Sequence, residues 1–307
     1  MASRDELSVP DFVRKEDLAR WCAVPVEELA AHSERRVPFR LCADSAAMGR
    51  LMAEELVDDI LGAARAGRSF RAIIPCGPSS WYEPFTELVV RRRVDLSHVE
   101  VFHMDECLDW EGKDVPREHP YSFRGFMERS FYGPVPDELG VPVANRHWPE
   151  PHRLAEITAD LLARPADLVY GGWGQDGHVA YNQARRTPFS PLTVAELRGS
   201  TARVQDNNVD TVVALAQRTL GGAYQFVPPM SVTLGMREIL AAAKIRLFSD
   251  TGAWKQTALR VGLFSPVTAE YPLTLLQEHP DALLTATHET ARHPLGDHPE
   301  WDLGIRA

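Results

Sequence analysis

The sequence lacks a long apolar run, closely paired cysteines and an excess of basic residues, and each absence excludes a class of protein. No stretch reaches the roughly 18 apolar residues that a membrane span needs, and the N-terminus, MASRDELSVPDF, has no apolar core of the kind found in secretion signals. Lysine and arginine together number 33 against 43 aspartates and glutamates, which gives a net charge of -10. That balance argues against nucleic acid or an anionic membrane as a partner, because both bind basic surfaces.

The four cysteines, Cys22, Cys42, Cys76 and Cys107, stand singly, with no C-x-x-C pair among them. In a chain of 307 residues this spacing favours reduced thiols over a disulfide framework. The missing secretion signal points the same way, so we expect a cytoplasmic protein.

Helical and strand patterns alternate regularly from residue 39 onward, and 44% of the residues are hydrophobic, enough for a sizeable core. This alternation predicts an α/β fold, in which right-handed crossovers build a mostly parallel sheet with helices on both faces. We expect residues 37–307 to form this single domain and the polar residues 1–36 to extend from it, with a short helix at about 26–34. The strands are expected at 70–75, 99–104, 167–172, 244–249 and 282–287, and the helices at about 45–67, 82–93, 153–164, 209–218 and 252–263.

Polar clusters follow three of the expected strands, at 76–80, 105–106 and 174–178. In open parallel sheets, ligands bind beyond the carboxyl ends of the strands. The three clusters therefore predict one active-site cleft at that edge of the sheet.

Two pairs of residues in these clusters are candidates for proton transfer. Asp105 and Glu106, in VFHMDECLDW, fit a solvated strand end as well as a general base whose neighbour raises its pKa. In GGWGQDGHVAYNQ, Asp176 and His178 flank a glycine, so a tight turn brings them together. A lone loop histidine is more often structural, but an imidazole oriented by an acid is the usual proton carrier near neutral pH.

Two further features indicate a bound anion. PCGPSS, residues 75–80, lies between an expected strand and helix, where backbone N–H groups favour an anion, but it lacks the spacing of a P-loop or a dinucleotide fingerprint. Lys255 stands in the first turn of an expected helix, which is unfavourable to the helix dipole unless an anion binds nearby.

His288, His293 and His298 recur every five residues, which is not one helix face, so no metal site is expected there.

Taken together, these segments resemble the glucosamine-6-phosphate deaminase/isomerase family and, more distantly, the 6-phosphogluconolactonases. FHMDECLDW is similar to the family's F-N-M-D-E-Y, and GGWGQDGHVAYNQ to G-G-x-G-x-D-G-H-I-A-F-N-E. REHPYSFRGFMERSFY, residues 117–132, resembles a lid segment that the lactonases lack. VPPMSVTLGMREIL, the helix with Lys255 and LLQEHPDALLT follow in matching order, so the resemblance covers about residues 37–290.

The resemblance implies a Rossmann-like, doubly wound sheet, assembly into homo-oligomers, and no metal or organic cofactor. It assigns Asp105 as the base that moves a proton between C2 and C1 of the opened sugar. It assigns His178, oriented by Asp176, to opening of the pyranose ring. The candidates for binding substrate and phosphate are Lys255, Gly77, Ser79, Ser80, Glu106 and Gly172.

Three positions depart from the family pattern. The phosphate loop T-G-G-T-P is CGPSSWY here, and Trp81 and Tyr82 become candidates for stacking on a sugar ring if the substrate carries no phosphate. The family's phosphate-binding arginine falls at Asn207 or Asn208, neither of which carries a charge. The glutamate that forms the third member of the proton relay is Gln183, which stays among the catalytic candidates.

These observations predict an enzyme that converts a 2-amino-2-deoxyhexose 6-phosphate, such as glucosamine 6-phosphate, to the ketose phosphate and ammonia. The alternatives are an aldose–ketose isomerase that releases no ammonia, a sugar-phosphate lactonase, and a sugar-phosphate sensor without catalysis. The lid segment argues against the lactonase. The sensor is disfavoured because residues 1–36 show no helix-turn-helix pattern that would bind DNA.

Overall fold

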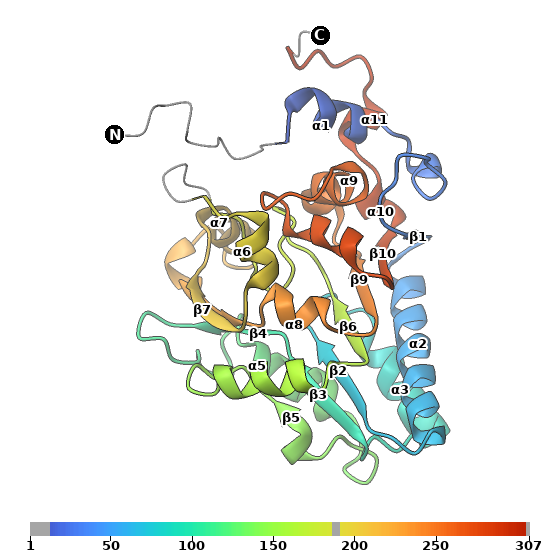
Figure 1. Ribbon diagram of the computed structural model, residues 1–307, viewed down its shortest axis with the longest axis vertical. Coiled ribbons are helices and arrows are strands. Elements are labelled where there is room, and N and C mark those ends of the chain that lie inside the picture. The colour runs from blue at the N-terminus through green and yellow to red at the C-terminus, as the bar shows by residue number, and fades with distance from the viewer. Residues whose placement is uncertain (1–12, 186–190, 305–307) are drawn as a thin grey trace.

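A seven-stranded sheet, parallel throughout, forms the centre of the computed structural model, which describes residues 13–185 and 191–304 (Figure 1). Its strand order is β1-β10-β9-β6-β2-β3-β5, and every neighbouring pair is parallel. The strands are β1 (Phe39–Cys42), β2 (Phe70–Ile74), β3 (Val99–His103), β5 (Arg146–His147), β6 (Leu168–Gly171), β9 (Ile245–Ser249) and β10 (Ala282–Thr287).

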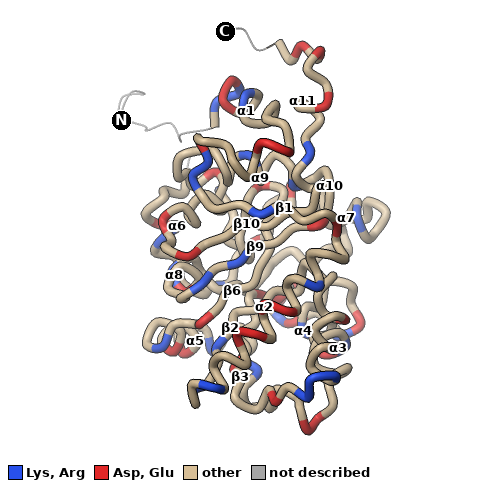
Figure 2. The backbone as a smooth tube through the Cα atoms, turned by 90° about the vertical axis from the view of Figure 1, so that its right-hand side faces the viewer, with Lys and Arg blue, Asp and Glu red and all other residues tan. Residues whose placement is uncertain are grey.

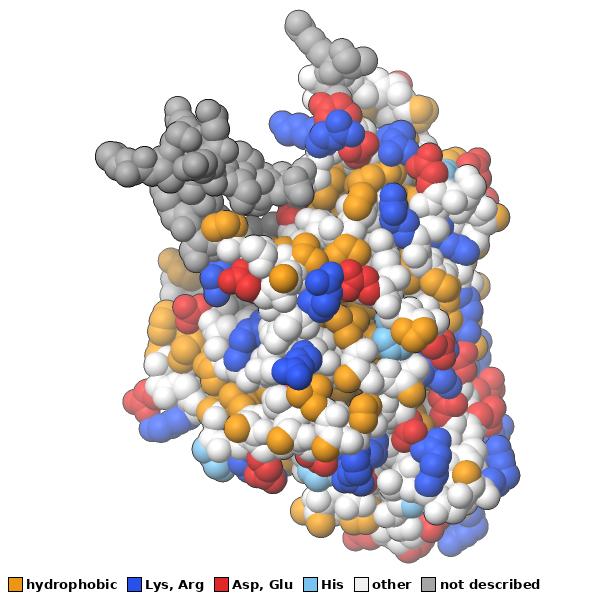
Figure 3. Space-filling view, viewed as in Figure 1, with side chains coloured by type: hydrophobic (Ala, Val, Ile, Leu, Met, Phe, Trp, Pro, Cys, Tyr) orange, Lys and Arg blue, Asp and Glu red, His pale blue; other side chains and the backbone are white. Residues whose placement is uncertain are grey.

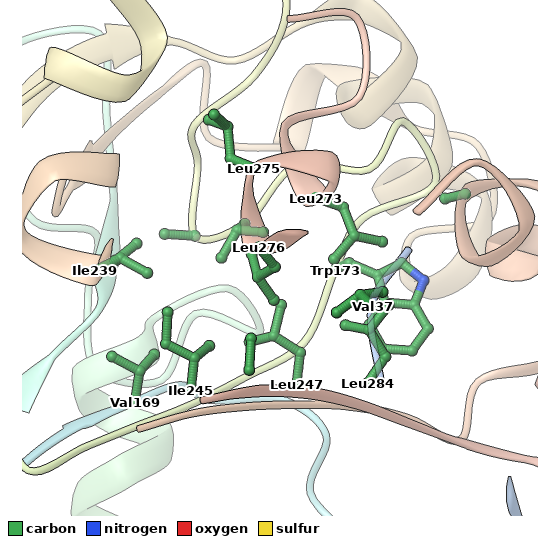
Figure 4. Close-up of a cluster of buried hydrophobic side chains, with 14 of the residues drawn as sticks. Val37, Val169, Trp173, Ile239, Ile245, Leu247, Leu273, Leu275, Leu276 and Leu284 are labelled. Carbon is green, nitrogen blue, oxygen red and sulfur yellow. The ribbon is translucent and has the colours of Figure 1, made fainter. Parts of the chain in front are cut away.

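Helices cover both faces of this sheet, because its strands are apolar on both sides. Ile73 and Val169 belong to one buried cluster and the adjacent Ala72 and Leu168 to the other. Figure 4 shows the first cluster, in which Leu247 and its strand neighbours lie beneath side chains of the covering helices. The predicted doubly wound α/β fold is confirmed.

The first cluster packs beneath α1 (Lys15–Cys22), α5 (Leu154–Ala163), α6 (Val194–Gly199), α8 (Met236–Leu240), α9 (Gln256–Phe264) and the 3-10 segment η6 (Pro272–Glu278). The second packs beneath α2 (Ser45–Arg65), α3 (Tyr82–Arg92), α4 (Phe123–Met127) and the π-helical turn η2 (Glu128–Tyr132). The remaining helices and turns are α7 (Val209–Thr219), α10 (His288–Ala291), α11 (Pro294–Asp297), η1 (Val26–Glu28), η3 (Val143–Asn145), η4 (Tyr224–Phe226) and η5 (Gly252–Lys255).

The order of the strands reverses between β2 and β6. From β2 the chain adds β3 and then β5 on one side, whereas β6, β9 and β10 build outward on the other side. Such a reversal leaves a crevice between the carboxyl ends of the two central strands, since their connections leave in opposite directions. The predicted cleft therefore lies where topology alone would place one.

A second, antiparallel sheet was not predicted. Its strands, in the order β4-β8-β7, are β4 (Asp105–Leu108), β8 (Met230–Thr233) and β7 (Arg203–Asp206). β4 starts one residue after β3 ends and is buried along its whole length, so DECL shows none of the polar–apolar alternation that marks a half-buried strand. Helix α7 follows β7 and brings its residues to the carboxyl edge of the main sheet.

The N-terminal segment differs from the prediction of a helix at about 26–34. Only a 3-10 turn, Val26–Glu28, forms there, and the α-helix lies earlier, at Lys15–Cys22. Val26 in that turn and Leu29 directly after it bury their side chains, and no further apolar side chain of this segment supports a longer helix, whose first turn is costly to form. Helix α1 instead buries Trp21 against α9.

Charges of both signs are interspersed over the molecule. Figure 2 shows acidic and basic residues alternating along the backbone, and the face in Figure 3 carries both kinds without a basic stripe. No helix within residues 13–185 and 191–304 is long and apolar enough to cross a membrane.

Candidate active site

A cavity of about 320 Å³ opens at the carboxyl edge of the main sheet. Its floor comes from residues that follow four neighbouring strands, β9, β6, β2 and β3. These floor residues are Thr251, Trp254 and Lys255 after β9, Gly172–Gln175 and His178 after β6, Pro75–Pro78 after β2, and Met104 and Asp105 after β3.

The lid segment, residues 117–132, and helix α7 form the upper walls. The lid contributes Pro120, Tyr121, Phe123 and Phe126, and α7 contributes Thr211, Leu215 and Arg218. The Tyr121 hydroxyl donates a hydrogen bond of 2.6 Å to the Leu215 carbonyl, and the His119 ring Nε2 lies 3.2 Å from the Phe226 carbonyl beyond α7. The lid segment is therefore tied to α7 through Tyr121 and to the following turn, η4, through His119.

Asp105 and Glu106 occupy adjacent buried positions with different surroundings. Asp105 lines the cavity, and burial, with a smaller contribution from Glu106, raises the pKa of its carboxyl to about 8. Burial also raises the pKa of Glu106, to about 7, although its carboxyl accepts hydrogen bonds from the backbone N–H groups of Cys107, Phe123 and Arg124. Asp105 can thus exchange its proton near neutral pH, while Glu106 lies outside the cavity wall and holds the first turn of α4.

The glycines of the 171–183 segment make room for a histidine. A Cβ atom at Gly174 would overlap the His178 imidazole, and Gly177 adopts a φ of +73° that favours glycine. His178 Nδ1 lies 2.6 Å from Asp176 Oδ1, and the ring stacks on Tyr181 at 5.7 Å between centroids. The buried Asp176 carboxylate favours the proton on Nδ1, which leaves Nε2 as the ring nitrogen available to a ligand in the cavity.

Gln183 is not in the cavity wall. Its amide nitrogen donates to Thr211 Oγ1 at 2.5 Å, and its carbonyl oxygen accepts from the Asn208 backbone N–H at 3.0 Å. Thr211 does line the cavity and also accepts a 3.4 Å hydrogen bond from Gln175. Any influence of Gln183 on a bound substrate therefore passes through Thr211.

The predicted phosphate loop is divided between several environments. Gly77 and Gly172 line the cavity, but Ser79 lines a separate hollow with Glu83 on α3. Ser80 faces the other way: its backbone carbonyl lies so close to Gly49 of α2 that a Cβ atom at that glycine would collide with it. The structure does not bring these two serines to the cavity.

Trp81 and Tyr82 do not offer a surface for stacking on a sugar. Both are buried, their rings stack at 4.3 Å between centroids, and the Tyr82 hydroxyl donates to the Pro75 carbonyl at 2.6 Å. They belong to the hydrophobic core beneath α2 and α3, so the expectation that they face the substrate is wrong.

Arg218 is a cavity residue that the sequence reasoning missed. Asn207 and Asn208, where the family's arginine was expected, bind the backbone carbonyls of Pro228 and Ala184, respectively. Arg218 comes from the far end of α7, where a basic residue is ordinary because it suits the helix dipole. Only the packing of α7 over the sheet reveals that its side chain reaches the same cavity as Lys255.

Burial, with a smaller contribution from the Arg218 guanidinium, lowers the pKa of the half-buried Lys255 amine to about 7. Within the described residues, no group of three or more His, Cys, Asp or Glu is arranged to hold a metal ion.

Comparison with known proteins identifies relatives along most of the chain. The glucosamine-6-phosphate deaminase of Aliivibrio fischeri (strain MJ11) is 30% identical over 226 residues, covering 71% of this chain and 78% of the relative. That of Aeromonas salmonicida (strain A449) is 28% identical over 260 residues, covering 81% and 89%. No family model matches the chain.

Solved structures share the fold. A monomeric glucosamine-6-phosphate deaminase of the NagB superfamily superposes with a TM-score of 0.69 at 18% identity, covering 82% of this chain and 98% of that one. A 6-phosphogluconolactonase from Trypanosoma cruzi gives 0.58 at 18% identity, covering 82% and 95%.

Asp105→Asn is expected to stabilise the fold, by an amount that grows with pH. An unfolded aspartate has a pKa of about 3.9, and the folded-state value is about 8. The wild type therefore loses up to ~1.4 kcal/mol of stability per pH unit between about pH 4 and 8, a loss that the neutral amide avoids. Urea unfolding of both proteins across this pH range measures the difference between their free energies of unfolding. Asp137→Asn, at an exposed acid, is the control. A difference in unfolding free energy between Asp105→Asn and the wild type that does not change with pH would contradict this prediction.

Proposed function

Because the chain belongs to the glucosamine-6-phosphate deaminase family of the NagB superfamily, a group of sugar-phosphate enzymes, we propose that it converts a 2-amino-2-deoxyhexose 6-phosphate to the ketose phosphate and ammonia. One observation carries the proposal: a buried carboxyl, Asp105, and an acid-oriented imidazole, His178, line the same cavity. Proton transfer at neighbouring carbons needs such a pair of acid–base groups facing one substrate.

Asp105 is proposed to carry the proton between C2 and C1 of the open-chain sugar. A general base works best when its pKa lies near the working pH, and burial brings the pKa of Asp105 to about 8. The ionised form is the base, so the fraction of active enzyme rises as the pH increases toward 8. Glu106, next to it, contributes to the raised pKa and anchors the lid segment through Phe123 and Arg124.

His178 is proposed to move the proton of the ring oxygen when the pyranose opens and closes. Asp176 lies against Nδ1, so Nε2 is the atom that exchanges the proton with the sugar. Gly174 supports this role indirectly, since any side chain at that position would displace the imidazole.

A second candidate, aldose–ketose isomerisation without loss of ammonia, is favoured by Gln183. The relay of the family that the sequence resembles has a glutamate at this position, and the amide here supplies no charge to help an amine leave. The Gln183 amide does not line the cavity itself, but it donates a hydrogen bond to Thr211, which does.

A substrate screen is expected to show activity on phosphorylated amino sugars. The screen compares glucosamine, glucosamine 6-phosphate, glucose 6-phosphate and 6-phosphogluconolactone, with ammonia and ketose measured separately. Ammonia and ketose in equal amounts from glucosamine 6-phosphate support the deaminase. Ketose alone, from glucose 6-phosphate, selects the isomerase, and hydrolysis of the lactone or no turnover of any compound contradicts both.

Asp105→Asn is expected to lower kcat by about 100-fold or more, because it removes the general base. Ligand binding should persist, since the amide keeps the shape of the side chain. In the wild type, solvent deuterium should enter the product at C1 or C2, and kcat/KM should fall as the pH drops below about 8. Near-normal turnover in the variant would remove Asp105 from this role.

Gln183→Glu is expected to raise kcat/KM for ammonia release from glucosamine 6-phosphate, relative to kcat/KM for ketose formation from glucose 6-phosphate. The new carboxylate adds a negative charge beside Thr211 and favours the cationic transition state of a departing amine. The ratio of the two kcat/KM values is measured for both proteins, with Gln205→Glu, a glutamine of β7 that does not line the cavity, as the control. An unchanged ratio means that residue 183 does not decide the outcome of the reaction.

A further inference from the structure

Two cations line the cavity without a carboxylate partner. Arg218 and Lys255 both belong to its wall, and among the described residues neither has an Asp or Glu oxygen within 4.0 Å. The buried Arg71, by contrast, binds the carboxylates of both Glu100 and Asp160. Unpaired cations facing a cavity are suited to an anionic ligand, which would satisfy both at once.

The indole of Trp254 brings the two cations together. The Arg218 guanidinium carbon lies 4.1 Å from the Trp254 ring centroid, and Lys255 Nζ lies 4.6 Å from it. The negative face of an aromatic ring attracts cations, so Trp254 offsets part of the repulsion between the two like charges. The remaining repulsion contributes to the lowered pKa of Lys255, and a bound anion would relieve it.

The cations come from opposite walls of the cavity. Lys255 is the last residue of η5, in the segment that follows β9, and its backbone carbonyl accepts a 3.5 Å hydrogen bond from Trp173. Arg218 comes from the last turn of α7, roughly 15 Å along the helix axis from Asn208 at its start. An anion that contacts both is therefore bound by α7 on one side and by the segment after β9 on the other.

We propose that Arg218, supported on the Trp254 ring, is a specificity-determining residue that binds the substrate's anionic group together with Lys255. It supplies the second cationic contact that Asn207 and Asn208 do not provide. The identity of the ligand as a sugar phosphate rests on the proposed function, whereas the two-cation site stands on the geometry.

The test compares the binding of glucosamine 6-phosphate and of glucosamine by calorimetry, in the Asp105→Asn background, in which turnover is expected to be slowed by about 100-fold or more. Arg218→Gln should weaken binding of the phosphorylated sugar by at least 10-fold and leave binding of glucosamine unchanged. Arg237→Gln, at an exposed arginine of α8 outside the cavity, is the matched control. Circular dichroism confirms that each variant is folded.

The number of protons taken up on ligand binding gives a second measurement, which would not change if Arg218 had only a structural role. At pH 8 a phosphate monoester is already a dianion, and Lys255, with a pKa of about 7, is mostly neutral. Binding should then take up roughly 0.5–0.9 proton per ligand, measured in buffers of different ionisation enthalpy. The uptake should vanish in Lys255→Met and shrink in Arg218→Gln, because removal of the neighbouring charge raises the pKa of Lys255 and leaves a larger fraction of it protonated before binding.

The results separate this proposal from the proposed function. Phosphate affinity and proton uptake that are unchanged in Arg218→Gln overturn the role of Arg218, even if the wild type deaminates amino sugars. Arg218-dependent binding of glucose 6-phosphate or inorganic phosphate, without deamination of any amino sugar, supports the site and contradicts the proposed reaction.

Discussion

The burial of two carboxyl groups side by side at the start of β4 is the constraint on which the rest of the site depends. Removing charge from water is costly, so Asp105 keeps its proton to an unusually high pH. Glu106 avoids part of the same cost by accepting three backbone N–H groups, two of which belong to the lid segment. The pair therefore produces a basic carboxyl in the cavity and a fixed lid above it. The free-energy cost of burying these two carboxyls thus falls at the cavity, where the proposed proton transfer needs a carboxyl with a raised pKa.

The main fold was predictable because its signals are local and repeated. The strand patterns and the Asp44 cap of α2, whose carboxylate accepts the Ala47 N–H, are each visible in a short window of sequence. The meeting of Asp105, His178 and Lys255 at one cavity followed from a general rule about parallel sheets. None of these inferences required knowledge of how one element packs on another.

The parts that escaped prediction depend on direction and on packing. Ser79, Ser80 and Trp81 follow a strand in the expected place, but a turn sends successive side chains to different sides, and the sequence does not say which. Arg218 gave no signal, because a basic residue at the end of a helix needs no explanation. Lys255 was noticed for the opposite reason, since a cation at the start of a helix is unfavourable.

The hydrogen bond from Tyr121 to Leu215 joins the cover of the site to the helix that carries Arg218. A movement of α7 toward an anion therefore pulls the lid segment with it, and a shift of the lid changes how far the arginine reaches. The anion contact proposed for Arg218 and the cover over the cavity are therefore joined by this hydrogen bond. We therefore expect that a substitution which repositions α7 for a different anion also shifts the lid segment, so that a change of substrate needs compensating changes in the lid.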